Sequence, residues 1–167
     1  MSSKAKSTRY KFLNDPNALF TETSDLPSAI AASRNVINPT PVAPAGTTST
    51  TTVMMGLAIS FTPLYSGRVK IIIAGEASNN TAGDGFLIYA AYGTGAAPAN
   101  GAAATGTTAG NGVKGASASA NALLPFSIVA VVTGLTVGTP IWVDLWLAAV
   151  TGGTAYVSNL SVIVEEF

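Results

Sequence analysis

The stretch 139–167, TPIWVDLWLAAVTGGTAYVSNLSVIVEEF, indicates most directly how this chain folds. Apolar residues recur at every second position on both sides of Gly152-Gly153. A period of two is the pattern of β-strands, because successive side chains of a strand point to opposite faces. The glycine pair interrupts the pattern and marks a turn. The stretch therefore predicts two strands, within 139–153 and 154–167.

The same period recurs toward the N-terminus. It runs through 67–78, where Val69, Ile71 and Ile73 share one face and Lys70 and Ile72 lie on the other. Turn-forming residues separate such runs and little helical periodicity intervenes, which is typical of sandwiches and barrels. We therefore expect an all-β fold, an antiparallel, jelly-roll-like β-sandwich over 53–167. The remaining predicted strands are 53–62, 85–93 and 123–135.

Residues 1–52 differ from the rest and predict an N-terminal arm. Ser24 can cap a short helix over 24–35. Three prolines follow within 39–44, and proline keeps a connector extended. We expect this arm and its Pro-rich connector to anchor the protein to a capsid or another partner, and 53–167 to form the β domain.

Charge is scarce in this chain. Only 10% of the residues are charged and the formal net charge is zero, against roughly 25% charged residues in ordinary soluble domains. Because solubility normally relies on charge, this composition favours a surface that faces other proteins. Four bases within 4–11 precede the first acid. They indicate either a solvated start or a segment that meets an acidic protein surface, and we do not expect nucleic acid to be the partner.

The residue types exclude several kinds of chemistry. The chain has no Cys and no His, which removes disulfides, thiolate chemistry, His-bearing zinc sites and Ser-His or Cys-His nucleophiles. We predict no catalytic residue, no cofactor and no metal. No apolar run approaches the roughly 20 residues of a membrane span, and the start has no apolar signal core. We expect synthesis in a host cytoplasm without secretion.

Carboxylates are the remaining candidates for catalysis. Glycoside hydrolysis needs two acids in one cleft with separated pKa values. Asp84 lies in a Gly-Asp-Gly turn, where backbone geometry explains it, Glu76 stands alone, and Glu165-Glu166 are expected to discourage edge pairing. None of these, nor Asp144, forms a convincing pair, so the sequence predicts a protein that is not an enzyme.

Trp142, Asp144 and Trp146 fall on one face of a predicted strand. Two indole rings flanking a carboxylate are able to stack on a sugar and accept its hydroxyls. The alternative is that both faces of this strand are buried, one in the core and one in a subunit interface, with Asp144 paired to Arg68 or Lys70. A strand that is apolar on both faces indicates cover on both sides and hence oligomerisation.

The stretch 93–122, GTGAAPANGAAATGTTAGNGVKGASASANA, has Lys114 as its only charge. Its Gly-Thr-Gly opening resembles a dinucleotide loop, but Pro98 stands at the sixth position and no helical period follows, so a phosphate cradle is excluded. We expect a long surface excursion with one or two weak strands, TGTTAGN (105–111) and VKGASASA (113–120). Its small side chains let backbones, including those of a neighbouring subunit, approach closely.

Three phrases carry a family resemblance: SFTPLYSGRVKIIIAGEASNNTAGDG (60–85), YGTGAAPANGAAATGTTAGN (92–111) and VVTGLTVGTPIWVDLWLAAVTGGTA (131–155). Together they resemble the Gly/Ala/Thr-rich β-sandwich virion proteins of tailed bacteriophages, of the capsid-decoration or fibre type. The resemblance implies a structural sandwich, often a homotrimer, on the outside of a capsid or in a tail fibre. Residues 1–52 do not share it.

Together these features predict a capsid decoration or cement protein located in the virion. Its partners would be the major capsid protein or other virion subunits, which it would bind through apolar and basic residues of the arm. The alternative is a tail-fibre or receptor-binding module that recognises host glycan through Trp142, Asp144 and Trp146 or through 93–122. The predicted arm contacts are Arg9, Tyr10, Lys11, Phe12, Leu13, Leu19 and Phe20.

Overall fold

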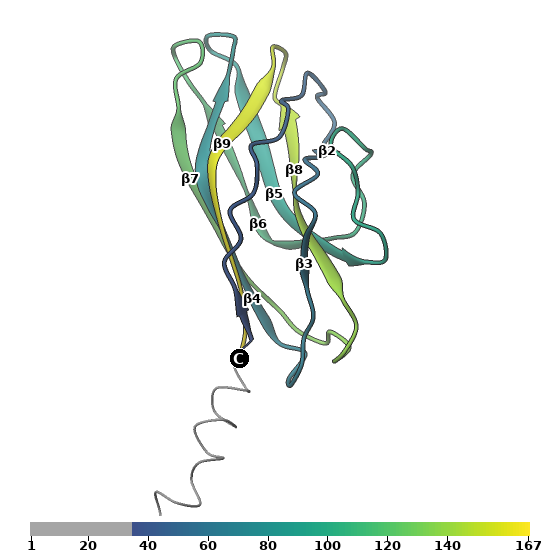
Figure 1. Ribbon diagram of the computed structural model, residues 1–167. Helices are drawn as coiled ribbons and strands as arrows, with labels where there is room; N and C mark the ends of the chain where they lie inside the picture. Colours follow the sequence, from purple (N-terminus) through teal and green to yellow (C-terminus); the bar gives the residue numbers. More distant parts are fainter. Residues whose placement is uncertain (1–34) are drawn as a thin grey trace, which may run out of the picture. The chain divides into compact units, whose positions relative to one another are not determined.

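The computed structural model describes residues 35–167 (Figure 1). All regular secondary structure within that range is β-strand. A search of the same residues for a membrane-spanning helix found none. The short helix predicted over 24–35 lies outside the described residues except for Asn35. The strands are β1 (Val36–Ile37), β2 (Val53–Met54), β3 (Ile59–Phe61), β4 (Val69–Asn79), β5 (Gly85–Thr94), β6 (Thr107–Ala116), β7 (Leu124–Val132), β8 (Ile141–Ala149) and β9 (Ala155–Glu166).

The strands form two antiparallel sheets. Sheet A has the order β1-β9-β4-β7, and sheet B has the order β2-β8-β5-β6, with β3 also paired to β8. The chain changes sheet at every step except from β2 to β3 and from β5 to β6 (Figure 1). Because β2 and β3 pair with successive parts of β8, they act as one interrupted strand. With this strand counted once, each sheet has four strands in the order of a jelly roll. The predicted fold is confirmed.

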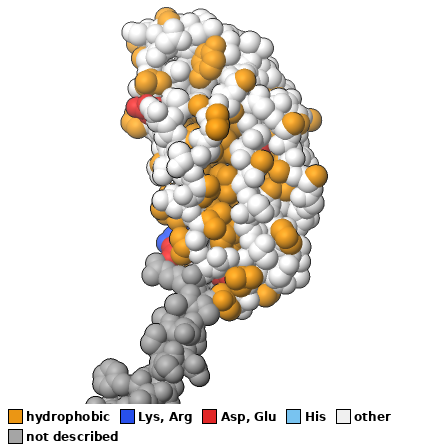
Figure 2. All heavy atoms as spheres, viewed as in Figure 1, with side chains coloured by type: hydrophobic (Ala, Val, Ile, Leu, Met, Phe, Trp, Pro, Cys, Tyr) orange, Lys and Arg blue, Asp and Glu red, His pale blue; other side chains and the backbone are white. Residues whose placement is uncertain are grey.

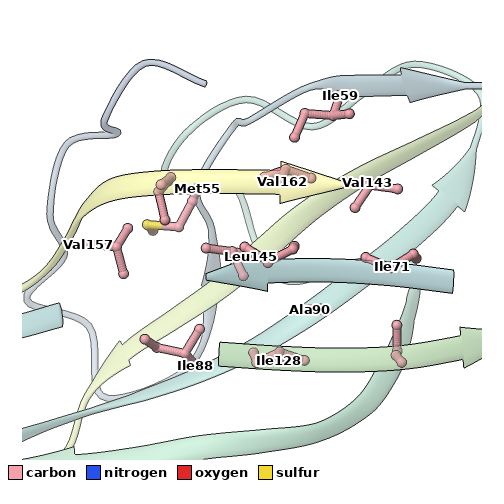
Figure 3. Close-up of a cluster of buried hydrophobic side chains, with 14 of the residues drawn as sticks. Met55, Ile59, Ile71, Ile88, Ala90, Ile128, Val143, Leu145, Val157 and Val162 are labelled. Atoms are coloured by element: carbon pink, nitrogen blue, oxygen red, sulfur yellow. The ribbon is translucent and has the colours of Figure 1, made fainter. Parts of the chain in front are cut away.

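The core lies between the inward faces of the two sheets (Figure 3). Ile71 and Ile73 of β4 and Val143 and Leu145 of β8 are fully buried there, as the alternation in the sequence predicts. Burying each such side chain stabilises the fold by about 1.5–3 kcal/mol before conformational entropy is subtracted. The period of two therefore assigns the core-facing residues correctly in both strands.

Residues 35–52 belong to the sandwich. Val36 and Ile37 pair with β9, Thr47 exchanges two backbone hydrogen bonds with Ala155, and the carbonyl of Ser49 accepts the amide of Ala149. Residues 35–52 and 53–167 thus lie in one compact unit, Asn35–Phe167. Prolines donate no backbone hydrogen bond, so the Pro-rich part lies between these anchor points without joining the ladder.

β9 is an interior strand of sheet A, with β1 on one side and β4 on the other. Glu165 and Glu166 therefore do not guard a sheet edge, contrary to the prediction. The edge is formed by β1, whose two residues carry too little pattern to reveal a strand in the sequence.

The Gly/Ala/Thr-rich stretch contributes one strand, β6, to the edge of sheet B. β6 covers parts of both predicted weak strands, and its register against β5 shifts between Ile88 and Ala90. Such a bulge inserts unpaired residues and breaks the period of two. Residues 95–106 form the loop between β5 and β6, and 117–122 lie between β6 and β7 (Figure 1).

Candidate functional site

The outer face of sheet B carries Trp142, Asp144 and Trp146, and the loop 95–106 packs against it. Trp142 is only 5% exposed, and its Nε1 donates to the carbonyl of Thr94 at 3.2 Å. Trp146 is half-buried, and its Nε1 donates to the carbonyl of Thr105 at 3.1 Å. The two indole rings are thus held by backbone carbonyls near the two ends of the loop.

Glycines of the stretch 93–122 make room for these rings. At Gly93 and Gly106 a Cβ atom would lie 2.3 Å from the ring of Trp142, and at Gly112 it would lie 2.3 Å from the ring of Tyr89. Tyr89 also meets Trp146 edge to face, with ring centroids 6.3 Å apart. Aromatic rings therefore rest directly on glycine backbone, which explains why this stretch needs small residues.

Asp144 is fully buried and holds the interruption between β2 and β3. Its carboxylate accepts the amides of Gly56 and Leu57, each at 3.0 Å, and the amide of Leu145 at 2.7 Å. In this bulge four residues, 55–58, stand opposite two residues of β8. Burial raises the pKa of Asp144, and the amide hydrogen bonds, led by that of Leu57, oppose the rise.

Asp144 does not bind Arg68 or Lys70, the partners expected from the sequence. Its carboxylate binds backbone amides, whereas Lys70 forms an ion pair with Glu165 on sheet A. The outer face of β8 is also covered differently from the subunit interface that was expected. Its cover comes from this chain's own 95–106, so the apolar outer face of β8 gives no indication of a subunit interface. Of the three residues on this face, Trp146 alone keeps appreciable exposed surface.

Glu166 is buried at the end of β9 and is surrounded by amide donors from the β3–β4 loop. Its carboxylate accepts the amides of Leu64 at 2.7 Å, Tyr65 at 2.8 Å, Ser66 at 2.5 Å and Gly67 at 3.2 Å. Burial alone would raise the pKa of Glu166, but the amides together lower it to about 2. The side chain thus fastens a loop to the end of the sandwich.

The other described carboxylates also bind protein groups. Asp84 accepts the amides of Gly85 at 2.7 Å and Thr151 at 2.9 Å, and the Thr151 amide is the main reason that its pKa is lowered. Glu76 accepts the side-chain amide of Asn159. Each of the five carboxylates in residues 35–167 therefore holds another part of the fold. The same range contains no group of three potential metal ligands.

The outer face of sheet A is different, because its apolar residues stay open to solvent. Val129 and Val131 of β7 are 61% and 57% exposed. The ion pair of Lys70 and Glu165 lies beside them on the same face. On the side of the molecule that Figure 2 shows, charged side chains occupy only a few points of the surface. We call the outward valines and isoleucines of sheet A the valine–isoleucine face; they are Val36, Ile72, Val129, Val131 and Ile163.

Sequence reasoning did not single out the valine–isoleucine face. Its signal was a run of apolar residues in 123–135 that leaves Val129 and Val131 on the face opposite Ile128 and Ala130. The predicted arm contacts, Arg9 to Phe20, lie outside the described residues.

Comparison with known proteins gives limited similarity. No protein-family model and no curated protein sequence matches the chain. Among solved structures, the chain is similar to the infectious bursal disease virus Gx strain structure, with a TM-score of 0.45 and 16% identity over 79% of this chain. It is also similar to the T13 particle of that virus, with a TM-score of 0.46 and 12% identity over 80% of this chain. The match spans 33% and 31% of those chains, about a third of their length.

Proposed function

We propose that this chain is a non-enzymatic structural protein of a virion, a capsid decoration protein that stabilises the assembled shell. The observation that carries the proposal is the use of every described carboxylate to hold the fold. Together with a sequence free of Cys and His, this leaves the described residues without a free acid–base pair or nucleophile system.

Three further features support a role in assembly. Jelly-roll sandwiches serve as viral capsid and lectin domains, although a fold by itself does not determine function. Charge is scarce in the sequence, and sheet A presents apolar residues to solvent. The phrases at 60–85, 92–111 and 131–155 resemble virion β-sandwich proteins of tailed phages, which favours the capsid or fibre setting.

The proposed mechanism is selective binding of the assembled state. A protein that binds the closed shell but not its free subunits stabilises the shell by mass action. Arg9 and Lys11 would meet acidic patches, and the aromatic residues Tyr10, Phe12 and Phe20 would supply apolar contacts. The major capsid protein is the proposed partner, and the homotrimer implied by the resemblance is the proposed oligomer.

Co-sedimentation with capsids that lack this protein tests the proposal. We would compare the full chain, a chain with Tyr10, Phe12 and Phe20 changed to Ala, and a control with the exposed Val42 changed to Ser. The expected result is saturable binding of the full chain and the control, and weakened binding of the triple variant with an unchanged circular dichroism spectrum. Absence of binding by the full chain would contradict the decoration role.

The alternative role, recognition of host glycan, rests on one observation. Trp146 keeps exposed surface on the outer face of sheet B, beside Tyr89. A glycan array with the full chain, repeated with Trp146→Ala and with Val42→Ser as control, tests it. Hits that disappear only in Trp146→Ala would favour glycan binding, whereas an array without hits would argue against it.

A further inference from the structure

The valine–isoleucine face has a regular arrangement of residues across β4 and β9. Lys70 stands opposite Glu165, Ile72 stands opposite Ile163, and Ala74 stands opposite Ser161. These residues point outward, because their neighbours along each strand, among them Ile71 and Val164, are fully buried in the core. Each row thus joins one residue of β4 to one of β9.

The first row extends to both sides. Lys70 is followed outward by Val131 of β7, and Glu165 is followed outward by Val36 of β1. One half of the face therefore carries a valine and the partly exposed Lys70, and the other half carries a valine and Glu165, whose side chain keeps only 10% of its surface exposed beside Lys70. The dividing line runs between β4 and β9.

A two-fold axis parallel to the strands, above this line, makes the face complementary to itself. A second copy turned by 180° about the axis places each β4 position over the β9 position of the same row. Lys70 of one copy then faces Glu165 of the other, Ile72 faces Ile163, and Val131 faces Val36. Every such pairing occurs twice in a two-fold contact, and sheets commonly pack face to face with nearly aligned strands.

We propose that the valine–isoleucine face binds the same face of a second copy of this chain about a two-fold axis. Charge complementarity selects this occupant. The charges of Lys70 and Glu165 cancel within one copy, so the ion pair does not attract a partner of high net charge. A second copy presents the same two charges in reversed order and at the same spacing. The face also supplies exposed apolar area that such a contact removes from water.

This self-association goes beyond the proposed virion role and does not depend on it. It also differs from a trimer. Three-fold contacts join unlike surfaces of neighbouring subunits, whereas a two-fold contact joins identical surfaces. The two-fold contact predicts assemblies with an even number of copies, either dimers or paired trimers, whose mass halves when the face is disrupted.

Charge reversal followed by mixing tests the contact. Lys70→Glu alone and Glu165→Lys alone each place like charges opposite each other twice across the axis. Each also breaks the ion pair within its own chain. When the two variants are mixed, the carboxylate introduced at position 70 of one copy faces the ammonium group introduced at position 165 of the other. The unchanged Glu165 of the first copy faces the unchanged Lys70 of the second. Attraction is restored only between unlike copies, while both internal pairs stay broken.

The measurement is sedimentation velocity of the full chain over a range of concentrations. Each single reversal should raise the dissociation constant at least about tenfold, and an equimolar mixture should recover assembly. Lys114→Glu, on exposed β6 of sheet B, is the matched control and should leave assembly unchanged. Val129→Ser, compared with Val42→Ser, provides an uncharged test at two exposed valines.

Four outcomes would overturn the proposal. These are a wild-type chain that stays monomeric, an assembly with an odd number of copies, an assembly whose mass is unaffected by either reversal and by Val129→Ser, and a mixture that fails to recover association. A chain that pairs as described but does not bind capsids would refute the proposed decoration role and leave this contact intact.

Discussion

The two outer faces of the sandwich differ in exposure: one is covered and the other is open to solvent. Both belong to strands with apolar residues on both sides. On sheet B the loop 95–106 packs on Trp142, whose indole rests on Gly93 and Gly106. On sheet A, Val129 and Val131 remain open to solvent. A second apolar face on a strand therefore indicates cover without identifying its source. On sheet B the chain covers itself, and on sheet A we propose that a second copy does.

The largest expected effect concerns the carboxylate beneath the cover of sheet B. Asp144→Ala would leave three amides without their acceptor, the buried one of Leu145 and the half-buried ones of Gly56 and Leu57, and we expect the free energy of unfolding to fall by about 4 kcal/mol. The measurement is urea unfolding followed by tryptophan fluorescence.

Glu76→Ala is the matched control on the outer face of sheet A, where the carboxylate meets one exposed side-chain amide. We expect it to cost less than about 1 kcal/mol. Equal losses for the two variants would show that Asp144 does not hold the bulge between β2 and β3.

The next largest effect concerns the fit of the cover itself. Gly106 has φ +88°, and a Cβ atom there would meet the ring of Trp142 and the carbonyl of Tyr92. Gly106→Ala combines backbone strain of about 1–2 kcal/mol with this clash, so we expect a loss of about 3 kcal/mol in unfolding free energy.

Gly95→Ala separates the two causes, because Gly95 has a similar φ of +83° with no atom within 4 Å of the added Cβ. It should cost about 1–2 kcal/mol, from strain alone. If both variants lose the same stability, the ring of Trp142 does not rest on Gly106 as described.

A pH titration compares Glu166, at the end of the sandwich, with Asp144 under the cover. The pKa of Glu166 is lowered from 4.5 to about 2, so its stabilisation is complete above about pH 4.5 and is lost as the pH falls toward 2. The pKa of Asp144 is raised, so its contribution has the opposite sign and decreases as the pH rises through that pKa.

Thermal unfolding between pH 2 and 7 measures both contributions. Relative to wild type, Glu166→Gln should lose less stability on acidification and Asp144→Asn should lose more. Parallel curves for wild type and Glu166→Gln would contradict the role given to the amides of 64–67.

The smallest expected effect is on the open face. Val129→Ser removes an exposed apolar side chain, so we expect the unfolding free energy of the monomer to change by no more than about 0.5 kcal/mol. Ala91→Ser, under the cover on sheet B where Ala91 is fully buried, should cost more than about 1 kcal/mol, because a hydroxyl enters a closed site. Chemical unfolding at a concentration that keeps the chain monomeric measures both; a larger loss for Val129→Ser would mean that its face is covered within the chain.

Several features of the candidate site could be read only in part from the sequence. Alternation correctly placed Trp142, Asp144 and Trp146 on one face, but it could not show that Asp144 binds the amides of Gly56 and Leu57, 88 and 87 residues earlier. β1 was hidden because two residues give no period. β6 was divided because its bulge against β5 shifts the register.

Residue types and a local period of two were enough to predict the strands, the residues that face the core and the absence of Cys and His chemistry. The folded chain was needed to show which outer face is covered, which rings the glycines of 93–122 accommodate, and which groups each carboxylate binds. Those outcomes depend on contacts between segments far apart in the chain, such as Gly106 with Trp142 and Glu166 with the 64–67 loop. A local pattern contains no information about which distant segment will supply such a contact.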